Sequence, residues 1–278
     1  MDPWPVTFQI VEKNSITSVR SFIDAVFCLR EDIQYEKLWY RGHSDFGFEL
    51  TPSVGRKQRY AGKELVFTRA QEISLLHRFR RRAYPLTGRA MTAGEAIFLA
   101  RHHGFPTRLL DWTANALYAL YFACFEQGVP AHDPDGRVWA MLRRETIQLD
   151  AFDLAKKTSE ADLFDFVISE KEDPDTSSHA IKMLHPFYNS PRLLSQDGAF
   201  TIHSHPRRSI ESYQGEDFYK VDLDIDKLWW WRIPVKSKTP IIRELSGLGI
   251  THRTLYPDLD GIARSLWETE VLWSGSEL

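Results

Sequence analysis

Apolar residues recur at helical spacing through the first half of the chain, and this pattern predicts several amphipathic helices. Over residues 15–30 they repeat every three or four positions, as a helix with one buried face requires. Thr92 and Glu95 form a capping pair before another apolar run. We expect helices at residues 15–30, 64–82, 93–103 and 115–127, with Pro85 ending the second of them.

Runs of β-branched and aromatic residues predict strands, most of them later in the chain. The candidates are residues 37–42, 106–112, 137–142, 198–203, 218–223 and 227–235. We also expect an acidic helical stretch at 151–172 and two late helices, one with Pro240 at its first position and one at about 258–267. This order predicts a single α+β domain over residues 1–278, with N-terminal helices and a strand-rich C-terminal part.

Composition and charge exclude several classes of protein. The 278 residues are 43% hydrophobic and 26% charged, which is typical of a globular chain and excludes a disordered one or a disulfide scaffold. A formal net charge of −3 excludes a chain that is basic throughout. Residues 76–108 nevertheless contain seven arginines against one acidic residue, Glu95, so the basic stretch from Arg78 to Arg108 is a candidate site for nucleic acid.

The cysteines and the apolar runs indicate where the protein works. Cys28 and Cys124 lie in apolar helical patterns, and we expect both as buried reduced thiols. The first residues show neither the basic nor the apolar region of a signal peptide. The longest apolar run, at residues 116–125, is about half a bilayer span. We therefore expect a cytoplasmic protein that does not enter the membrane.

The common catalytic and metal-binding motifs are absent from the sequence. There is no glycine-rich phosphate loop, no HExxH and no GxSxG. His102 and His103 are adjacent, so they do not share a helix face. His203 and His205 share a strand face but lack an evident third ligand. We therefore expect no metal site.

Four polar segments remain as candidates for chemistry. Tyr40-Arg41-Gly42-His43 stands at a strand end, where a glycine lets a ligand approach the backbone. Its alternative interpretation is a strand end with a surface arginine. The second segment surrounds a short apolar strand with His102, Arg108, Asp111, Trp112 and Thr113. If that strand is buried, its charges need partners, so a structural Arg–Asp pair is as good an interpretation as a catalytic one.

The other two segments lie late in the chain. Gln196 precedes an Asp-Gly pair and a strand, which equally suits a plain turn. Asp258 stands near a helix start, where capping is the favoured interpretation over catalysis.

These segments together resemble the FRG domain family, which is named for a Phe-Arg-Gly motif. The motif stands here as Tyr40-Arg41-Gly42, with tyrosine in place of phenylalanine. The phrase at residues 102–113 is similar to the most specific signature of the family, and residues 196–200 and 256–261 are similar to later motifs. The resemblance covers about residues 20–267. It implies a fold family and leaves the reaction open.

The order of the motifs is also similar to that of ADP-ribosyltransferase-like domains, which implies that fold and NAD as the substrate. In those domains an Arg or His before a glycine marks the nicotinamide site, and a late acidic or amide residue contacts the ribose. This analogy implies catalytic roles for Arg41, Gln196 and Asp258. Arg41 and Arg108 would hold the diphosphate, and Tyr40 or Trp112 would stack on a base. The NAD-binding residues that it implies are Tyr40, Gly42, His43, His102, Arg108, Asp111, Trp112 and Thr113.

Three functions therefore stay open at the level of the sequence. The first is an NAD-using ADP-ribosyltransferase or NAD hydrolase, such as a bacterial toxin or anti-phage effector with a macromolecular acceptor and an antitoxin-like partner. The second is a module that binds nucleic acid or protein without catalysis. The third is a different hydrolase, such as a nuclease, whose candidate carboxylates Asp111, Asp258 and Asp260 lack a metal-site spacing.

Overall fold

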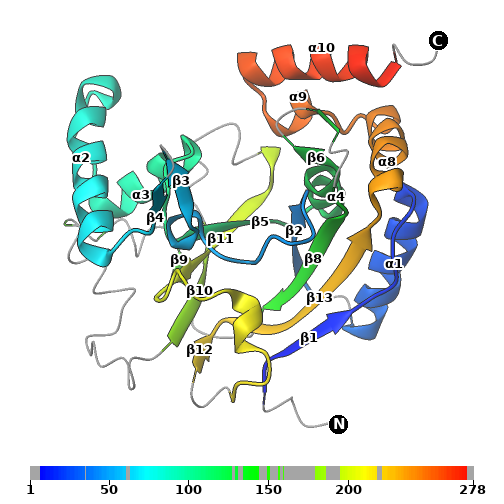
Figure 1. The fold of residues 1–278 in the computed structure, drawn as a ribbon, viewed down its shortest axis with the longest axis horizontal. Helices are drawn as coiled ribbons and strands as arrows, with labels where there is room; N and C mark the ends of the chain where they lie inside the picture. Colours follow the sequence, from blue (N-terminus) through cyan, green and yellow to red (C-terminus); the bar gives the residue numbers. More distant parts are fainter. Residues whose placement is uncertain are drawn as a thin grey trace.

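The computed structural model describes residues 7–34, 36–60, 63–126, 129–130, 134–143, 149–150, 156, 159, 179–185, 195–217 and 221–273. In this part the chain forms one mixed α+β body (Figure 1). The α-helices are α1 Val19–Asp32, α2 Arg69–Thr87, α3 Ala93–His102, α4 Ala116–Cys124, α8 Val235–Gly247, α9 His252–Leu255 and α10 Leu259–Trp273. The expected stretch at 151–172 lies almost entirely outside the described residues.

The core of the fold is one open sheet of mixed direction. Its strands are β1 Gln9–Glu12, β2 Leu38–His43, β5 Leu109–Thr113, β8 Gly136–Arg143, β9 Leu149–Asp150, β10 His179–His185, β11 Gly198–His203, β12 Val221–Leu223 and β13 Ile225–Ile233. They follow the order β1-β13-β8-β2-β5-β11-β10-β12, with β9 beside β10. Two small hairpins, β3 Gln58–Tyr60 with β4 Lys63–Leu65 and β6 Phe125–Glu126 with β7 Val129–Pro130, stand apart from it.

This topology confirms the α+β class and corrects the expected division of the chain. The N-terminal strand β1 pairs in parallel with β13 near the other end of the chain. Three helices, α8, α9 and α10, follow β13. Strands therefore come from both ends of the chain, and the C-terminal part is not mainly strand. β1 and β10 were missed because their pairing partners, rather than their own propensities, make them strands.

Side-chain alternation gives the sheet two buried faces. Tyr40 pairs with Thr113, so the face that carries both also carries Leu109 and Asp111. On this face α1, α4 and α8 pack over β2, β8 and β13, while α2 and α3 pack over β5 and β11 (Figure 1). The opposite face carries Trp39, Leu110 and Trp112 with a short 3₁₀ helix at Ile210–Tyr213. The two helix groups leave a space above the junction of β2 and β5.

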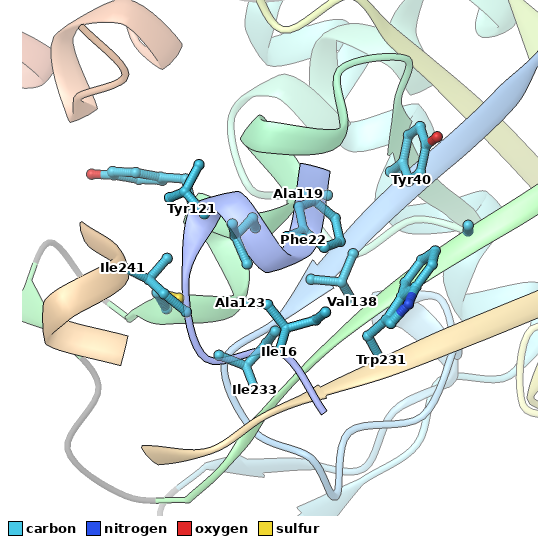
Figure 2. Close-up of a cluster of buried hydrophobic side chains, with 14 of the residues drawn as sticks. Ile16, Phe22, Tyr40, Ala119, Tyr121, Ala123, Val138, Trp231, Ile233 and Ile241 are labelled. Carbon is cyan, nitrogen blue, oxygen red and sulfur yellow. The ribbon is translucent and has the colours of Figure 1, made fainter. Parts of the chain in front are cut away.

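Helix α4 approaches the sheet closely because two glycines lie beneath it. A Cβ on Gly42 of β2 would lie 2.0 Å from the carbonyl oxygen of Ala119, and one on Gly136 of β8 would lie 2.3 Å from that of Ala123. Ala119 and Ala123 are one helical turn apart, so a single small-residue face of α4 rests on both glycines. Figure 2 shows these two alanines within the apolar cluster. In the same apolar cluster the ring of Phe22 packs edge to face against that of Trp231, with the ring centroids 5.6 Å apart.

Helix ends follow local capping rules where no distant contact competes. The Thr92–Glu95 capping box opens α3 as predicted, and Ser18 with Ser21 opens α1. Glu244 of α8 adds a bond, because its carboxylate accepts from the backbone N–H of Val19 at 2.6 Å. That contact binds α1 to α8 and suits a helix N-terminus.

Three local predictions were wrong. Helix α2 begins at Arg69 and runs through Pro85 to Gly88, whose left-handed φ of 67° ends it. Helix α8 begins at Val235, so Pro240 lies inside it; the N–H of Val235 is bound by Asp135 at 2.7 Å. Cys124 is buried as expected, whereas Cys28 is exposed on α1. Among the described residues no helix is long and apolar enough to cross a membrane.

We predict that Gly42→Ala destabilises the protein by about 2–3 kcal/mol, because α4 must move away from the added Cβ. Gly247→Ala is the matched control, since a Cβ there meets nothing within 4 Å. It should stabilise α8 by at most about 1 kcal/mol. Urea unfolding of the two variants checks this. Equal stability of both would show that α4 does not depend on the glycine.

Candidate functional site

The candidate site is a cavity that forms where β2 and β5 separate. The two strands pair at Tyr40 and Thr113 and at no other position. After Tyr40, β2 continues beside β8, while β5 stays with β11. The space between them, beneath α3 and α4, is a cavity of about 380 Å³. This volume is in the range of small-molecule sites.

Most of the site residues expected from the sequence line this cavity. From that set, the residues that line the cavity are Tyr40, Arg41, Gly42, His43, His102, Asp111, Trp112, Thr113 and Gln196. The sequence analysis missed several others, which are Ser44, Phe48, Arg56, Phe98, Arg101, Gly104, Phe122, Phe200 and Tyr256. Arg108 and Asp258 are absent from the lining.

Asp111 is the centre of the polar network in the cavity. Arg101 of α3 donates from Nε to both carboxylate oxygens at 3.0 and 3.1 Å, and from Nη2 to Oδ2. Nη1 of Arg41, on β2, lies 3.6 Å from Oδ2 of the same carboxylate and donates a hydrogen bond to the main-chain carbonyl oxygen of Asp111 at 2.7 Å. Two guanidinium groups from different elements therefore meet at one carboxylate, whose side chain remains 41% exposed.

Arg41 reaches Asp111 because the strands have separated. Strand alternation places Arg41 on the face of Trp39, opposite to Asp111. Beyond Tyr40 no backbone ladder joins β2 and β5. The guanidinium of Arg41 therefore lies between the two strands and donates a hydrogen bond to the main-chain carbonyl of Asp111 on β5. Arg41 thus ties the two strands together on one side of the cavity.

His43 accepts a hydrogen bond from the guanidinium of Arg41, and the partners of the two ring nitrogens define the tautomer of His43. Its Nδ1 lies 3.1 Å from the carbonyl oxygen of Phe48, so Nδ1 carries the proton. Its Nε2 then accepts from Nε of Arg41 at 2.9 Å. Burial, followed by the charges of Arg41 and Arg56, holds the pKa of His43 well below its usual range. His43 is therefore a neutral acceptor at physiological pH.

The wall opposite these charges is formed by a tight turn before β11. Thr113 donates from its hydroxyl to the main-chain carbonyl of Gln196 at 2.6 Å. The amide nitrogen of Gln196 donates to the carbonyl oxygen of Leu255 at 3.0 Å. Asp197 has a left-handed φ of 42°, and its carbonyl accepts from the N–H of Ala114. Gln196 is therefore held at the cavity by contacts with two other segments.

Aromatic side chains form much of the remaining wall, and they differ in how much of each side chain is exposed. Trp112 is buried and donates from Nε1 to Thr201 at 3.1 Å, and Tyr40 is only 2% exposed. Both rings are therefore packed in the core and present little surface at the cavity that they line. Phe48 is 42% exposed at the cavity, so it offers an accessible ring face.

Two expected site residues have structural positions elsewhere. Arg108 is 2% exposed and pairs with Glu72 of α2 at 2.7 Å, while its other bonds go to the carbonyls of His203 and Ser204. It neither contacts Asp111 as a structural pair nor reaches the cavity as a phosphate ligand. Asp258 is exposed and accepts from the N–H of Gly261 at 2.7 Å, as a cap of α10 does.

Gly42 lies both at the cavity and beneath α4. The space where its side chain would stand is filled by α4 rather than left for a ligand. Its backbone still contributes to the cavity lining.

The cavity carries an excess of positive charge. Its lining has three guanidinium groups, from Arg41, Arg56 and Arg101, and one carboxylate, from Asp111. Burial lowers the pKa of Arg41 to about 10, which still leaves it charged at neutral pH. With neutral histidines the formal charge of the lining is +2. Among the described residues no group of His, Cys, Asp and Glu could hold a metal ion.

Residues 36–131 match the family model of the FRG domain. The matched part contains the whole charged network, from Arg41 and His43 through Arg56 and Arg101 to Asp111. Gln196 and Tyr256 lie beyond it. No curated protein and no solved structure matches the chain.

We predict that His43 makes the native state sensitive to acid. Below pH about 6.5 the unfolded chain binds a proton at this histidine, whereas the native state does not, so stability is lost as the pH falls. Between pH 7 and pH 5 the wild type should lose about 2 kcal/mol relative to His43→Gln, which keeps an acceptor for Arg41. Urea unfolding at both pH values measures this difference. The same comparison for the exposed His77→Gln is the control, and a pH-independent difference for His43 would contradict the prediction.

Proposed function

We propose that this chain, which contains an FRG domain over residues 36–131, binds NAD in the cavity between β2 and β5 and cleaves its nicotinamide–ribose bond. The observation that carries the proposal is the composition of the cavity. A cluster of three arginines, an accessible aromatic ring at Phe48 and one carboxylate at Asp111 line the same space. Such a site suits a ligand with phosphates, a flat ring and a developing positive charge.

The chemistry asks little covalent work of the protein. The bond between ribose C1′ and the ring nitrogen of nicotinamide breaks, and its electron pair leaves with neutral nicotinamide. The ribose then carries a positive charge, as in glycoside hydrolysis. Water or a hydroxyl of an acceptor attacks C1′ and releases its proton to solvent. A carboxylate close to C1′ lowers the barrier by stabilising that charge.

Asp111 is our candidate for that carboxylate, with Gln196 as a second ribose contact. The analogy with ADP-ribosyltransferase-like domains implies a late acidic or amide residue, and in the described part of the cavity lining Gln196 is present but no glutamate is. Asp111 is the acidic residue there, and Arg101 and Arg41 fix its orientation. Arg41, expected to bind the diphosphate, acts in this proposal by positioning Asp111. Asp258 has no part in it.

We predict that Asp111→Asn lowers nicotinamide release by about 100-fold or more, as removal of a group that stabilises a transition state does. Release is followed from NAD by the purified protein, with and without cell lysate. Asp24→Asn, an exposed carboxylate change on α1, is the matched control and should keep full activity. Dependence on lysate would indicate transfer to a macromolecular acceptor. No release in either condition would overturn the proposal.

The proposed setting is a bacterial toxin or anti-phage effector that acts in the cytoplasm and is restrained by a partner. Loss of NAD stops growth, so expression of the wild type should arrest cells and Asp111→Asn should not. Equal growth of the cells that express the wild type and of those that express Asp111→Asn, with both proteins present and folded, would count against a role as a toxin.

A second candidate, a nucleic-acid-binding module, is favoured by the surface of α2. Arg78, Arg81 and Arg82 are exposed there. The basic stretch is shorter than the sequence implies, because Arg89, Arg101 and Arg108 are paired with carboxylates. Binding of RNA or DNA that weakens with salt and is lost in Arg81→Ala/Arg82→Ala, while Asp111→Asn still binds, would favour the module.

A further inference from the structure

The cavity contains one arginine whose guanidinium is only partly used by the protein. Arg56 directly follows the 3₁₀ helix Ser53–Gly55, and its Nε donates to the carbonyl oxygen of Thr51 at 2.8 Å. This is the hydrogen bond that the structure assigns to its side chain. Within the described part of the chain the two terminal nitrogens, Nη1 and Nη2, make no hydrogen bond or ion pair with the protein, and Arg56 lines the cavity.

The backbone that carries Arg56 is held rigidly. A Cβ on Gly55 would lie 1.6 Å from the carbonyl oxygen of Pro206, so the chain passes tightly against that segment. Val54 is buried, and its N–H donates to the carbonyl of Thr107. A guanidinium fixed at Nε and carried on a rigid segment loses little conformational entropy when it binds a ligand.

Arg101 stands beside Arg56 and is fixed from two sides. Asp111 binds its Nε and Nη2, and Ser53 accepts from its Nη1 at 3.2 Å. Ser53 opens the same 3₁₀ helix that Arg56 follows. The serine therefore sets the position of one arginine relative to the other.

The electrostatics of the pair favour an anion. Burial and then the charge of Arg101 lower the pKa of Arg56, and Asp111 offsets this only in part. Arg41 is a third positive charge, and besides burial the charges of Arg56 and Arg101 lower its pKa. Holding such charges close together costs free energy that an anion with two negative charges would recover.

We infer that Arg56 and Arg101 form the subsite that binds the diphosphate of the dinucleotide, with the terminal nitrogens of Arg56 as its bidentate fork. This inference rests on the proposed function for the identity of the substrate. It replaces Arg41 and Arg108, the arginines expected for this role, by two that the sequence did not single out. A diphosphate carries two negative charges, which match the excess charge of the lining, and a guanidinium fork fits two of its oxygens.

The test separates diphosphate binding from cleavage. Arg56→Ala should raise the KM for NAD by about 10- to 100-fold and leave kcat within about twofold, because the diphosphate is bound equally in the ground state and the transition state. With nicotinamide riboside, which lacks phosphate, wild type and Arg56→Ala should have equal kcat/KM. Arg56→Lys keeps the charge without the fork and should fall between them. Arg20→Ala, an exposed arginine change on α1, is the control.

Binding of cleavage-resistant ligands keeps the two proposals distinguishable. ADP-ribose and inorganic pyrophosphate should raise the melting temperature of the wild type and of Arg20→Ala but not that of Arg56→Ala. This pattern in a protein that does not cleave NAD would support the subsite and overturn the proposed function. Equal stabilisation of wild type and Arg56→Ala, or stabilisation of neither, would overturn the subsite. Stabilisation by pyrophosphate without ADP-ribose would assign the site to a free phosphate rather than to a dinucleotide.

Discussion

The carboxylate of Asp111 is the group on which the arrangement of charges in the cavity depends. It binds Arg101 through two nitrogens and lies within ion-pair distance of Arg41. Without it, three guanidinium groups would face one another in a partly buried space, and each would raise the energy of the others. The carboxylate orients them and leaves the cluster positive. A site built in this way is organised before a ligand enters, which lowers the cost of binding an anion.

The second constraint is the close contact of α4 with the sheet. Gly42 and Gly136 let the small face of α4 lie directly on β2 and β8, which secures one edge of the cavity. On the other side, the pair of Arg108 and Glu72 binds α2 to the segment before β5. The two halves then meet at Tyr40 and Thr113 and separate beyond them. The cavity is thus a consequence of two well-packed groups of helices that share one sheet. Part of its wall, from Gln196 and Tyr256, comes from outside the matched FRG domain.

Local chemistry made much of the secondary structure predictable. The capping box of Thr92 and Glu95 and the apolar periodicity of residues 15–30 predicted helices that the structure contains. Predictions failed where a distant partner decides: β1 is a strand because β13 lies beside it, and α8 begins early because Asp135 binds the N–H of Val235. Of the site, the polar segments, together with the motif resemblance that they carry, located Arg41, His43, Asp111 and Gln196. Arg56 carried no signal, since a lone arginine after a glycine in an irregular segment is common on protein surfaces.

The sequence by itself determined the α+β class of the fold, the resemblance that the FRG domain match over residues 36–131 bears out, and the segments that hold most of the polar site. It left open which partners the charges of Arg108 and Asp111 have, and in the structure Arg108 pairs with Glu72 while Asp111 binds Arg101. The tertiary structure decided which charges meet. Arg101 reaches Asp111 because α3 folds back over β5, and Arg41 reaches it because β2 leaves β5 after a single pair. These contacts join residues 10 and 70 positions apart. Such distances are closed by the packing of whole elements, which no local pattern along the chain records.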